Sequence, residues 1–172
     1  MKNIEIKFHT PSLSEIHSFL QYHPSISFQW EKEQTDIYFR VNRGRLKLRF
    51  QNNSEAELIF YQRDDDENAR LSQYLIYYPG QTNLLKDLLE NALGIRSVVK
   101  KKRTLYQFKN VRIHLDEVEN LGSFLECEAV VDDITDEETS RKNLHELLTY
   151  FSSFSLTPVA QSYVDLLQKV LV

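Results

Sequence analysis

Apolar and charged side chains alternate regularly along several stretches of this 172-residue chain, and this pattern constrains the fold more than any other feature. A period of two is typical of a β-strand that has one apolar face and one charged face. The pattern is clearest over residues 4–8, 36–41, 45–50, 111–116 and 125–129. Residues 58–63, 75–78 and 98–105 resemble further strands. The sequence therefore predicts about eight strands, the number that closes a small barrel.

Four other segments show the apolar spacing of amphipathic helices. They cover residues 12–20, 82–93, 144–151 and 157–170. Ser12 and Glu15 form a Ser-x-x-Glu capping box at the start of the first segment, and Gly94 is a stop signal after the second. Thr157 is expected to open the fourth helix, with Pro158 at its first position.

The helix stripes and the apolar strand faces must bury one another, which leaves the charged strand faces on the other side of the sheet. An open antiparallel sheet would expose those faces to water, and alternation alone is also typical of that arrangement. In a closed barrel they would line a polar interior. The charges are segregated by type, with Arg and Lys on some strands and Glu pairs on others. This favours an α+β fold, a closed antiparallel β-barrel of about eight strands with flanking helices, formed by residues 1–172 as one domain.

Composition narrows the class of protein. Apolar residues make up 41% of the chain and charged residues 27%, which is typical of a globular protein. No apolar stretch reaches the length of a membrane span, and the N-terminus lacks the apolar run of a signal peptide. The net charge of −4 argues against general nucleic-acid binding. We therefore expect a cytoplasmic protein without nucleic-acid or membrane partners.

Cys127 is the only cysteine, which excludes an intramolecular disulfide and indicates a reducing compartment. Its neighbours Glu126 and Glu128 would raise the pKa of its thiol, and this argues against a nucleophilic role. The chemistry of the chain is therefore to be sought in its charged side chains.

The cations of this acidic chain are gathered in two short stretches. These stretches hold nine of the 21 Lys and Arg residues, namely Arg40, Arg43, Arg45, Lys47, Arg49, Lys100, Lys101, Lys102 and Arg103. Such gathering is typical of a local anion site. The simpler interpretations are a solubilising edge strand for the first stretch and a basic loop or nuclear-import signal for the second. The acidic run 64–67 fits a solvated turn better than a metal site.

Residues 3–7 read Asn-Ile-Glu-Ile-Lys, close to a Glu-x-Glu-x-Lys signature. Segments 34–39, 44–49, 58–63, 101–103, 112–118, 121–128 and 162–167 follow in an order that extends the match over nearly the whole chain. Together these motifs resemble the CYTH superfamily, which includes class IV adenylate cyclases and thiamine triphosphatases, and the cyclase branch is the most similar. Asn3 replaces the first signature Glu and offers an oxygen without a charge. Weaker metal binding or fewer metal ions would follow.

The resemblance implies a tunnel in which Lys and Arg side chains bind a triphosphate. Residues two apart on a strand share a face, so Arg45, Lys47 and Arg49 would form a row along one wall. The other substrate-binding candidates are Arg63, Lys101 and Arg112. The catalytic candidates are Lys7, Arg103 and Asp116.

The resemblance also implies a divalent metal ion, Mg²⁺ or Mn²⁺, held by Glu5, Glu126 and Glu128. Hard cations prefer carboxylate oxygens, and Glu126 and Glu128 share one strand face about 7 Å apart along the chain. An exposed acidic strand is the simpler interpretation of this pair. Asp116 would add an outer contact to the metal or orient a basic neighbour. His114 would line the tunnel or hydrogen-bond a neighbour as a neutral ring.

Two reactions suit such a site. One is cyclisation of ATP to cyclic AMP and pyrophosphate, and the other is hydrolysis of a terminal phosphate of thiamine triphosphate or tripolyphosphate. Both depend on positioning and charge stabilisation, so the same residues serve either, and cyclisation is the favoured expectation. The alternatives are a non-catalytic module that binds polyphosphate or a nucleotide, and a barrel with no small-molecule site. The apolar helices are also compatible with a homodimer.

Overall fold

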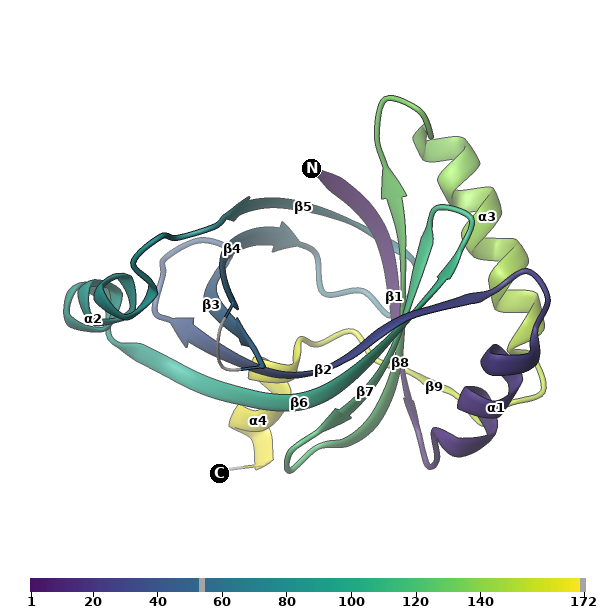
Figure 1. The fold of residues 1–172 in the computed structure, drawn as a ribbon, viewed down its shortest axis with the longest axis horizontal. Coiled ribbons are helices and arrows are strands. Elements are labelled where there is room, and N and C mark those ends of the chain that lie inside the picture. Colours follow the sequence, from purple (N-terminus) through teal and green to yellow (C-terminus); the bar gives the residue numbers. More distant parts are fainter. Residues whose placement is uncertain (53–54, 171–172) are drawn as a thin grey trace.

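The computed structural model describes residues 1–52 and 55–170, which form nine strands and four helices (Figure 1). In chain order the elements are β1 (Lys2–Thr10), α1 (Ser14–Tyr22), β2 (Ser27–Phe39), β3 (Arg45–Gln51), β4 (Glu55–Arg63), β5 (Arg70–Tyr77), α2 (Thr82–Leu93), β6 (Ile95–Phe108), β7 (Val111–Val118), β8 (Gly122–Val131), α3 (Glu137–Tyr150), β9 (Thr157–Pro158) and α4 (Tyr163–Val170). Within these residues, no helix has the length and apolar character needed to cross a bilayer.

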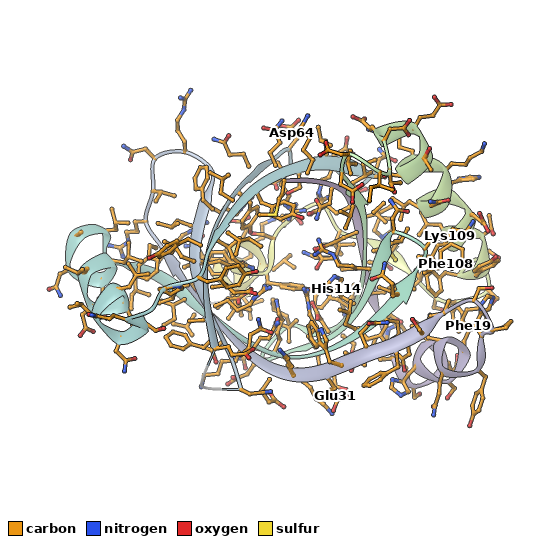
Figure 2. The ribbon with its side chains drawn as sticks, turned by 45° about the horizontal axis from the view of Figure 1, so that its top comes forward. Phe19, Glu31, Asp64, Phe108, Lys109 and His114 are labelled. Carbon is orange, nitrogen blue, oxygen red and sulfur yellow. The ribbon has the colours of Figure 1, made fainter. Side chains whose placement is uncertain are left out.

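Eight strands form a closed antiparallel barrel, which confirms the predicted fold. Neighbouring strands follow the order β5-β4-β3-β2-β6-β7-β8-β1, and β1 pairs with β5 to close the ring. The two-residue β9 adds to the edge of β1. Figure 2 shows the ring opened toward the viewer, with strand side chains projecting into its centre. Alternate residues of every strand therefore face a shared interior.

The apolar strand faces point outward and are covered by helices. α1 and α3 pack on one side of the barrel and α2 on the opposite side (Figure 1). The larger cluster joins Leu147 of α3 to Ile113 and Leu125 of the strands, all of them fully buried. Under α2, Leu85 packs with Phe39 of β2. Burying side chains of this size stabilises the fold by about 1.5–3 kcal/mol each, so the outer face of the sheet is the hydrophobic core.

α4 packs at one end of the barrel, against a cluster of apolar side chains from the strands. Val164 and Leu167 of α4 share a buried cluster with Val99 and Phe124, which lie two residues before Lys101 and Glu126 on their strands. Tyr163 belongs to the same cluster and also lines the interior. The helix therefore covers this end and contributes a side chain to the inside.

The predicted fourth helix begins later than the sequence indicates. Thr157 and Pro158 form β9 and pair with His9 and Phe8 of β1, so the helix prediction over 157–162 is wrong. The first turn forms instead after Ser162, whose carbonyl oxygen accepts from the backbone amide of Leu166. Pairing with an available strand edge outweighs the local preference of Pro for a helix start.

The predicted capping box at the first helix is also wrong. α1 begins at Ser14 and is preceded by Leu13, which provides no side-chain cap. The Ser12 hydroxyl accepts instead from the backbone amide of Ser14, at 3.3 Å. Ser12 therefore shapes the turn before the helix, whereas the stop at Gly94 after α2 is as predicted.

Candidate active site

A cavity of about 340 Å³ occupies the barrel interior. Its charged lining consists of seven cations, Lys7, Lys47, Arg49, Arg63, Lys101, Arg103 and Arg112, and four carboxylates, Glu5, Glu57, Glu126 and Glu128. His114 projects into the same space from β7 (Figure 2). The cations come from five strands, β1, β3, β4, β6 and β7, and so reach a common volume from several directions.

One wall is organised by a single buried aspartate, and we call Asp36 with Lys47, Arg49 and Lys101 the aspartate wall. Asp36 is fully buried on β2. Its carboxylate accepts from Lys47 Nζ at 2.8 Å, from Arg49 Nε at 2.7 Å and from Lys101 Nζ at 3.4 Å. The cross-strand register explains this convergence, because β2 lies between β3 and β6. Three cations therefore share one carboxylate.

The lysines of the aspartate wall are only partly compensated. Burial, and then the neighbouring Arg49, lower the pKa of Lys47 to about 8. Burial, and then Arg103, lower the pKa of Lys101 to about 7. Asp36 raises the pKa of both lysines, but its single negative charge does not fully compensate two lysines and an arginine. An anion entering the cavity would restore the charged form of both lysines.

The opposite wall is built on β1 and β8, and we call Glu5, Glu126, Glu128 and the cations that contact them the glutamate wall. Glu126 contacts Lys7 Nζ at 3.2 Å and Arg103 Nη2 at 2.8 Å. Burial raises the pKa of Glu126, but Lys7 and Arg103 lower it by more. The pKa of Glu126 therefore lies well below its usual value. Glu126 is therefore ionised and is matched by two cations.

Asp116 contacts Arg103, and the Tyr163 ring contacts Lys7. Asp116 Oδ1 accepts from Arg103 Nε at 2.6 Å, and Asp116 Oδ2 accepts from the Tyr163 hydroxyl at 2.7 Å. Burial raises the pKa of Asp116, but Arg103 then brings it down to about 2. The Tyr163 ring lies 4.1 Å from Lys7 Nζ. Asp116 therefore orients Arg103 without lining the cavity itself.

Glu128 and Glu5 complete the glutamate wall. Glu128 contacts Arg112 Nη2 at 2.8 Å and lies 3.5 Å from His114 Nε2. Burial and then Arg103 lower the pKa of His114, so the ring is neutral at pH 7. Glu5 accepts from Arg63, and burial raises the pKa of Glu5 despite this arginine.

The residues of the glutamate wall fit a divalent metal ion by their donor type. Glu5 and Glu128 are direct cross-strand partners, and Glu126 lies two residues before Glu128 on β8. Asn3 Oδ1 is buried without a hydrogen-bond partner among residues 1–52 and 55–170. Carboxylate and amide oxygens are the ligands that Mg²⁺ and Mn²⁺ prefer. Over the same residues, however, no group of three or more His, Cys, Asp or Glu side chains is gathered closely enough to hold an ion, because each carboxylate is turned to a cation.

Ten of the twelve predicted site residues line the cavity, and Arg45 and Asp116 do not. Arg45 shares a strand face with Lys47, but it lies at the first position of β3, where α4 covers the barrel. Its guanidinium contacts Asp165 of α4 at 2.7 Å and Asp65 at 3.0 Å. The placement of Arg45 in the cavity row is therefore wrong, because strand periodicity does not reveal where the barrel ends.

Several residues of the site were missed by sequence reasoning. Asp36 was noted only as part of an alternating strand, yet it anchors the aspartate wall. Tyr163 lies in a segment matched to the family but was given no role. Arg70, which is buried and lies 3.5 Å from Glu5, starts a strand whose predicted part began at residue 75. The signal that could have pointed to Asp36 is that it is the only aspartate of β2 and β3 and precedes the basic stretch of β3.

Two further predictions concern residues outside the cavity. Cys127 faces the outer core and is fully buried, and burial, then Glu126 and Glu128, raise the pKa of its thiol. It is therefore no nucleophile. Asp64 to Glu67 are exposed in the connection between β4 and β5 and lie outside the cavity lining.

Comparison with known proteins places this geometry in a family. The family model of the CYTH domain matches residues 1–163. A conserved hypothetical protein from Pyrococcus furiosus has a similar structure, with 24% identity, coverage of 95% of this chain and 99% of that chain, and a TM-score of 0.79. So does a candidate adenylate cyclase from Vibrio parahaemolyticus, with 18% identity, coverage of 96% and 97%, and a TM-score of 0.73.

The Pct1 RNA triphosphatase of S. pombe is a more distant structural match, with 11% identity, coverage of 94% of this chain and 86% of that chain, and a TM-score of 0.58. No curated protein matches the sequence significantly. At these identities the structural matches establish the fold and leave the reaction open. The family match covers most of the chain and agrees with the predicted resemblance. The chain therefore belongs to the CYTH domain family, whose members are typically metal-dependent enzymes that act on triphosphates.

Proposed function

We propose that this protein binds ATP in the barrel and converts it to cyclic AMP and pyrophosphate in a reaction that depends on Mg²⁺ or Mn²⁺. The observation that carries the proposal is the convergence of seven Lys and Arg side chains from five strands on one cavity. A triphosphate bears about four negative charges, and Arg and Lys are the side chains that bind phosphate oxygens most strongly. The four carboxylates of the lining leave part of this positive charge uncompensated.

Substrate and metal would exchange partners with the side chains already present. Lys7, Arg63 and Arg112 now contact Glu126, Glu5 and Glu128. Phosphate oxygens can take the place of these carboxylates as acceptors. The carboxylates would then be free to hold the metal ion, together with Asn3 Oδ1. When bound, that ion would supply charge neutralisation and would lower the pKa of the attacking hydroxyl.

Part of the cavity is suited to the organic portion of a substrate. The apolar and aromatic side chains of Trp30, Ile59, Ile76 and Leu105 belong to its lining. Inorganic tripolyphosphate makes no use of such a surface, whereas a nucleoside would bury its base there. This supports a nucleoside triphosphate as the substrate class.

The chain's own residues would act on the phosphates in cyclisation. In this reaction the ribose 3′-hydroxyl loses its proton to solvent and attacks the α-phosphorus, the bond to the bridging oxygen breaks, and pyrophosphate leaves. Lys47 and Lys101 would bind the departing negative charge, and Arg103, held by Asp116, would keep the phosphate in line. Preorganised cations of this kind stabilise developing charge without reorganisation.

Product analysis tests the proposal. Purified protein is incubated with Mg²⁺ or Mn²⁺ and, separately, with ATP, thiamine triphosphate and tripolyphosphate. The double variant Glu126→Gln/Glu128→Gln is expected to lose turnover by at least about a hundredfold. A matched double variant at two exposed positions at the end of β7 and in the turn after it, Glu117→Gln/Glu119→Gln, should retain it.

The products decide between the reactions. Cyclic AMP and pyrophosphate, absent with the cavity variant, would support the cyclase. Orthophosphate without a cyclic nucleotide would replace it with a triphosphatase. Thermal stabilisation by tripolyphosphate without any turnover would contradict both reactions and leave a binding module.

A further inference from the structure

Two amide side chains face each other across the strands at the other end of the cavity from α4. Gln34 of β2 lies directly opposite Gln51 of β3 in the strand register. Gln34 Nε2 donates to Gln51 Oε1 at 3.3 Å. Both side chains are buried, with 3% and 8% of their surface exposed, and Gln34 and Gln51 both line the cavity.

This amide pair has unused hydrogen-bonding capacity. Gln34 Oε1 is buried and accepts no hydrogen bond from any residue within 1–52 and 55–170. The Gln51 oxygen is already taken by Gln34, so the Nε2 group is the end of Gln51 that can bind a ligand. A buried acceptor without a partner costs free energy, and a ligand that supplies a donor removes that cost. The pair thus offers one acceptor and one donor to a ligand in the cavity.

The lining of the same cavity also contains apolar and aromatic side chains. Trp30 and Leu105 are register partners on β2 and β6, and Ile59 and Ile76 are register partners on β4 and β5. All four line the cavity. Flat heterocycles bind to surfaces of this kind, with a few polar groups that fix their orientation.

The amide pair also borders the basic part of the cavity. Gln34 lies opposite Lys101 in the β2–β6 register, and Gln51 follows Arg49 at the next inward position of β3. Glu57, opposite Arg49 on β4, places a carboxylate toward this end of the cavity lining. A triphosphate would avoid that carboxylate and lie toward the cations. A nucleotide bound in this way has its base beside the two glutamines.

We propose that Gln34 and Gln51 form a nucleobase subsite that selects adenine. Gln34 Oε1 accepts a hydrogen bond from the 6-amino group, and Gln51 Nε2 donates to an adjacent ring nitrogen. An amide side chain is the usual protein partner for this edge of adenine. Guanine has a carbonyl oxygen at position 6, so it would set an acceptor against Gln34 Oε1. The inference rests on the proposed function, because it names the part of the same site that holds the base.

Calorimetric titration with three probes tests the subsite. The probes are the α,β-methylene analogues of ATP and GTP, which lack the bridging oxygen that must leave in cyclisation, and inorganic tripolyphosphate, each with Mg²⁺. The wild-type protein should bind the ATP analogue at least about tenfold more tightly than the GTP analogue. In Gln34→Leu this ratio should fall to below threefold, while tripolyphosphate affinity changes by less than twofold.

Two further variants make the test specific. Gln51→Leu should lower the ratio of the affinities for the ATP and GTP analogues in the same way. Agreement between the two variants would show that the result does not come from a folding defect in Gln34→Leu. Gln62→Leu, at an exposed position of β4, should leave all three affinities unchanged. Retained tripolyphosphate binding reports that the barrel of each variant is intact.

The outcomes separate this inference from the proposed function. Equal wild-type affinities for the two nucleotide analogues would overturn the subsite alone, as would a Gln34→Leu variant that loses all three probes in the same proportion. Binding of none of the probes by the wild-type protein would overturn the proposed function and the subsite together.

Discussion

The two walls of the cavity differ in their balance of charge. On the aspartate wall, Asp36 alone faces three cations, and both lysines there have a lowered pKa. On the glutamate wall every carboxylate has its own Lys or Arg. Burying three cations with one carboxylate is costly for folding, whereas matched pairs are close to neutral. The difference indicates that the aspartate wall carries buried positive charge that an entering anion would compensate, whereas the glutamate wall is neutralised by its own cations.

Replacing Asp36 should have the largest effect on the stability of either wall. Asp36→Asn leaves three buried cations without a carboxylate, so the free energy of unfolding should fall by about 3–5 kcal/mol, as measured by urea denaturation. Asp65→Asn, an exposed partner of Arg45, is the control and should cost less than about 1 kcal/mol. Added tripolyphosphate should restore part of the loss in Asp36→Asn. Equal stability of the two variants would mean that Asp36 does not hold the wall together.

A smaller loss of stability is expected for a substitution on the glutamate wall. In Glu126→Gln, Arg103 retains Asp116, and Lys7 retains the face of the Tyr163 ring. The free energy of unfolding should therefore fall by only about 1–2 kcal/mol in the same urea experiment. A loss as large as that of Asp36→Asn would show that the two walls do not differ in the way described.

The third expected effect is a dependence of stability on pH. The pKa of Lys101 is about 7 in the folded protein, against 10.5 for an ordinary lysine. Between these values the unfolded chain binds more protons at this side chain than the folded protein, so stability rises with pH. Urea unfolding at pH 7, 8 and 9 should show this rise, and Lys101→Met should reduce the slope. Identical slopes in the two proteins would contradict the lowered pKa.

Much of the fold follows from alternation in the sequence. Segments such as 4–8 and 45–50 expose one apolar face and one charged face, and only the helices can cover the apolar one. The first half of β2 was missed because residues 27–33 are mostly exposed and carry no apolar stripe. Thr157 and Pro158 form a strand edge through contact with β1, which is distant in sequence. Local patterns record which face a residue occupies, but not such long-range pairings.

The same limit applies to the candidate site. Alternation and family motifs placed Lys47 and Arg49 inside the barrel, but they placed Arg45 there as well. Whether a residue lies at the centre or at the end of a strand depends on the shear of the barrel and on α4, which the period of two does not encode. The pairing of Gln34 with Gln51 depends on the β2–β3 register in the same way. Side chains that act through such cross-strand contacts could not be found from the sequence.

Titration of tripolyphosphate into Lys47→Met and Arg45→Met tests the central claim most directly. The two positions share one strand and one face, yet only Lys47 lines the cavity. One tripolyphosphate should bind per wild-type chain. Lys47→Met should weaken this binding at least about tenfold, and Arg45→Met should weaken it less than about threefold. Equal weakening in the two variants, or no binding to the wild-type protein, would contradict the claim that this cavity is a triphosphate site.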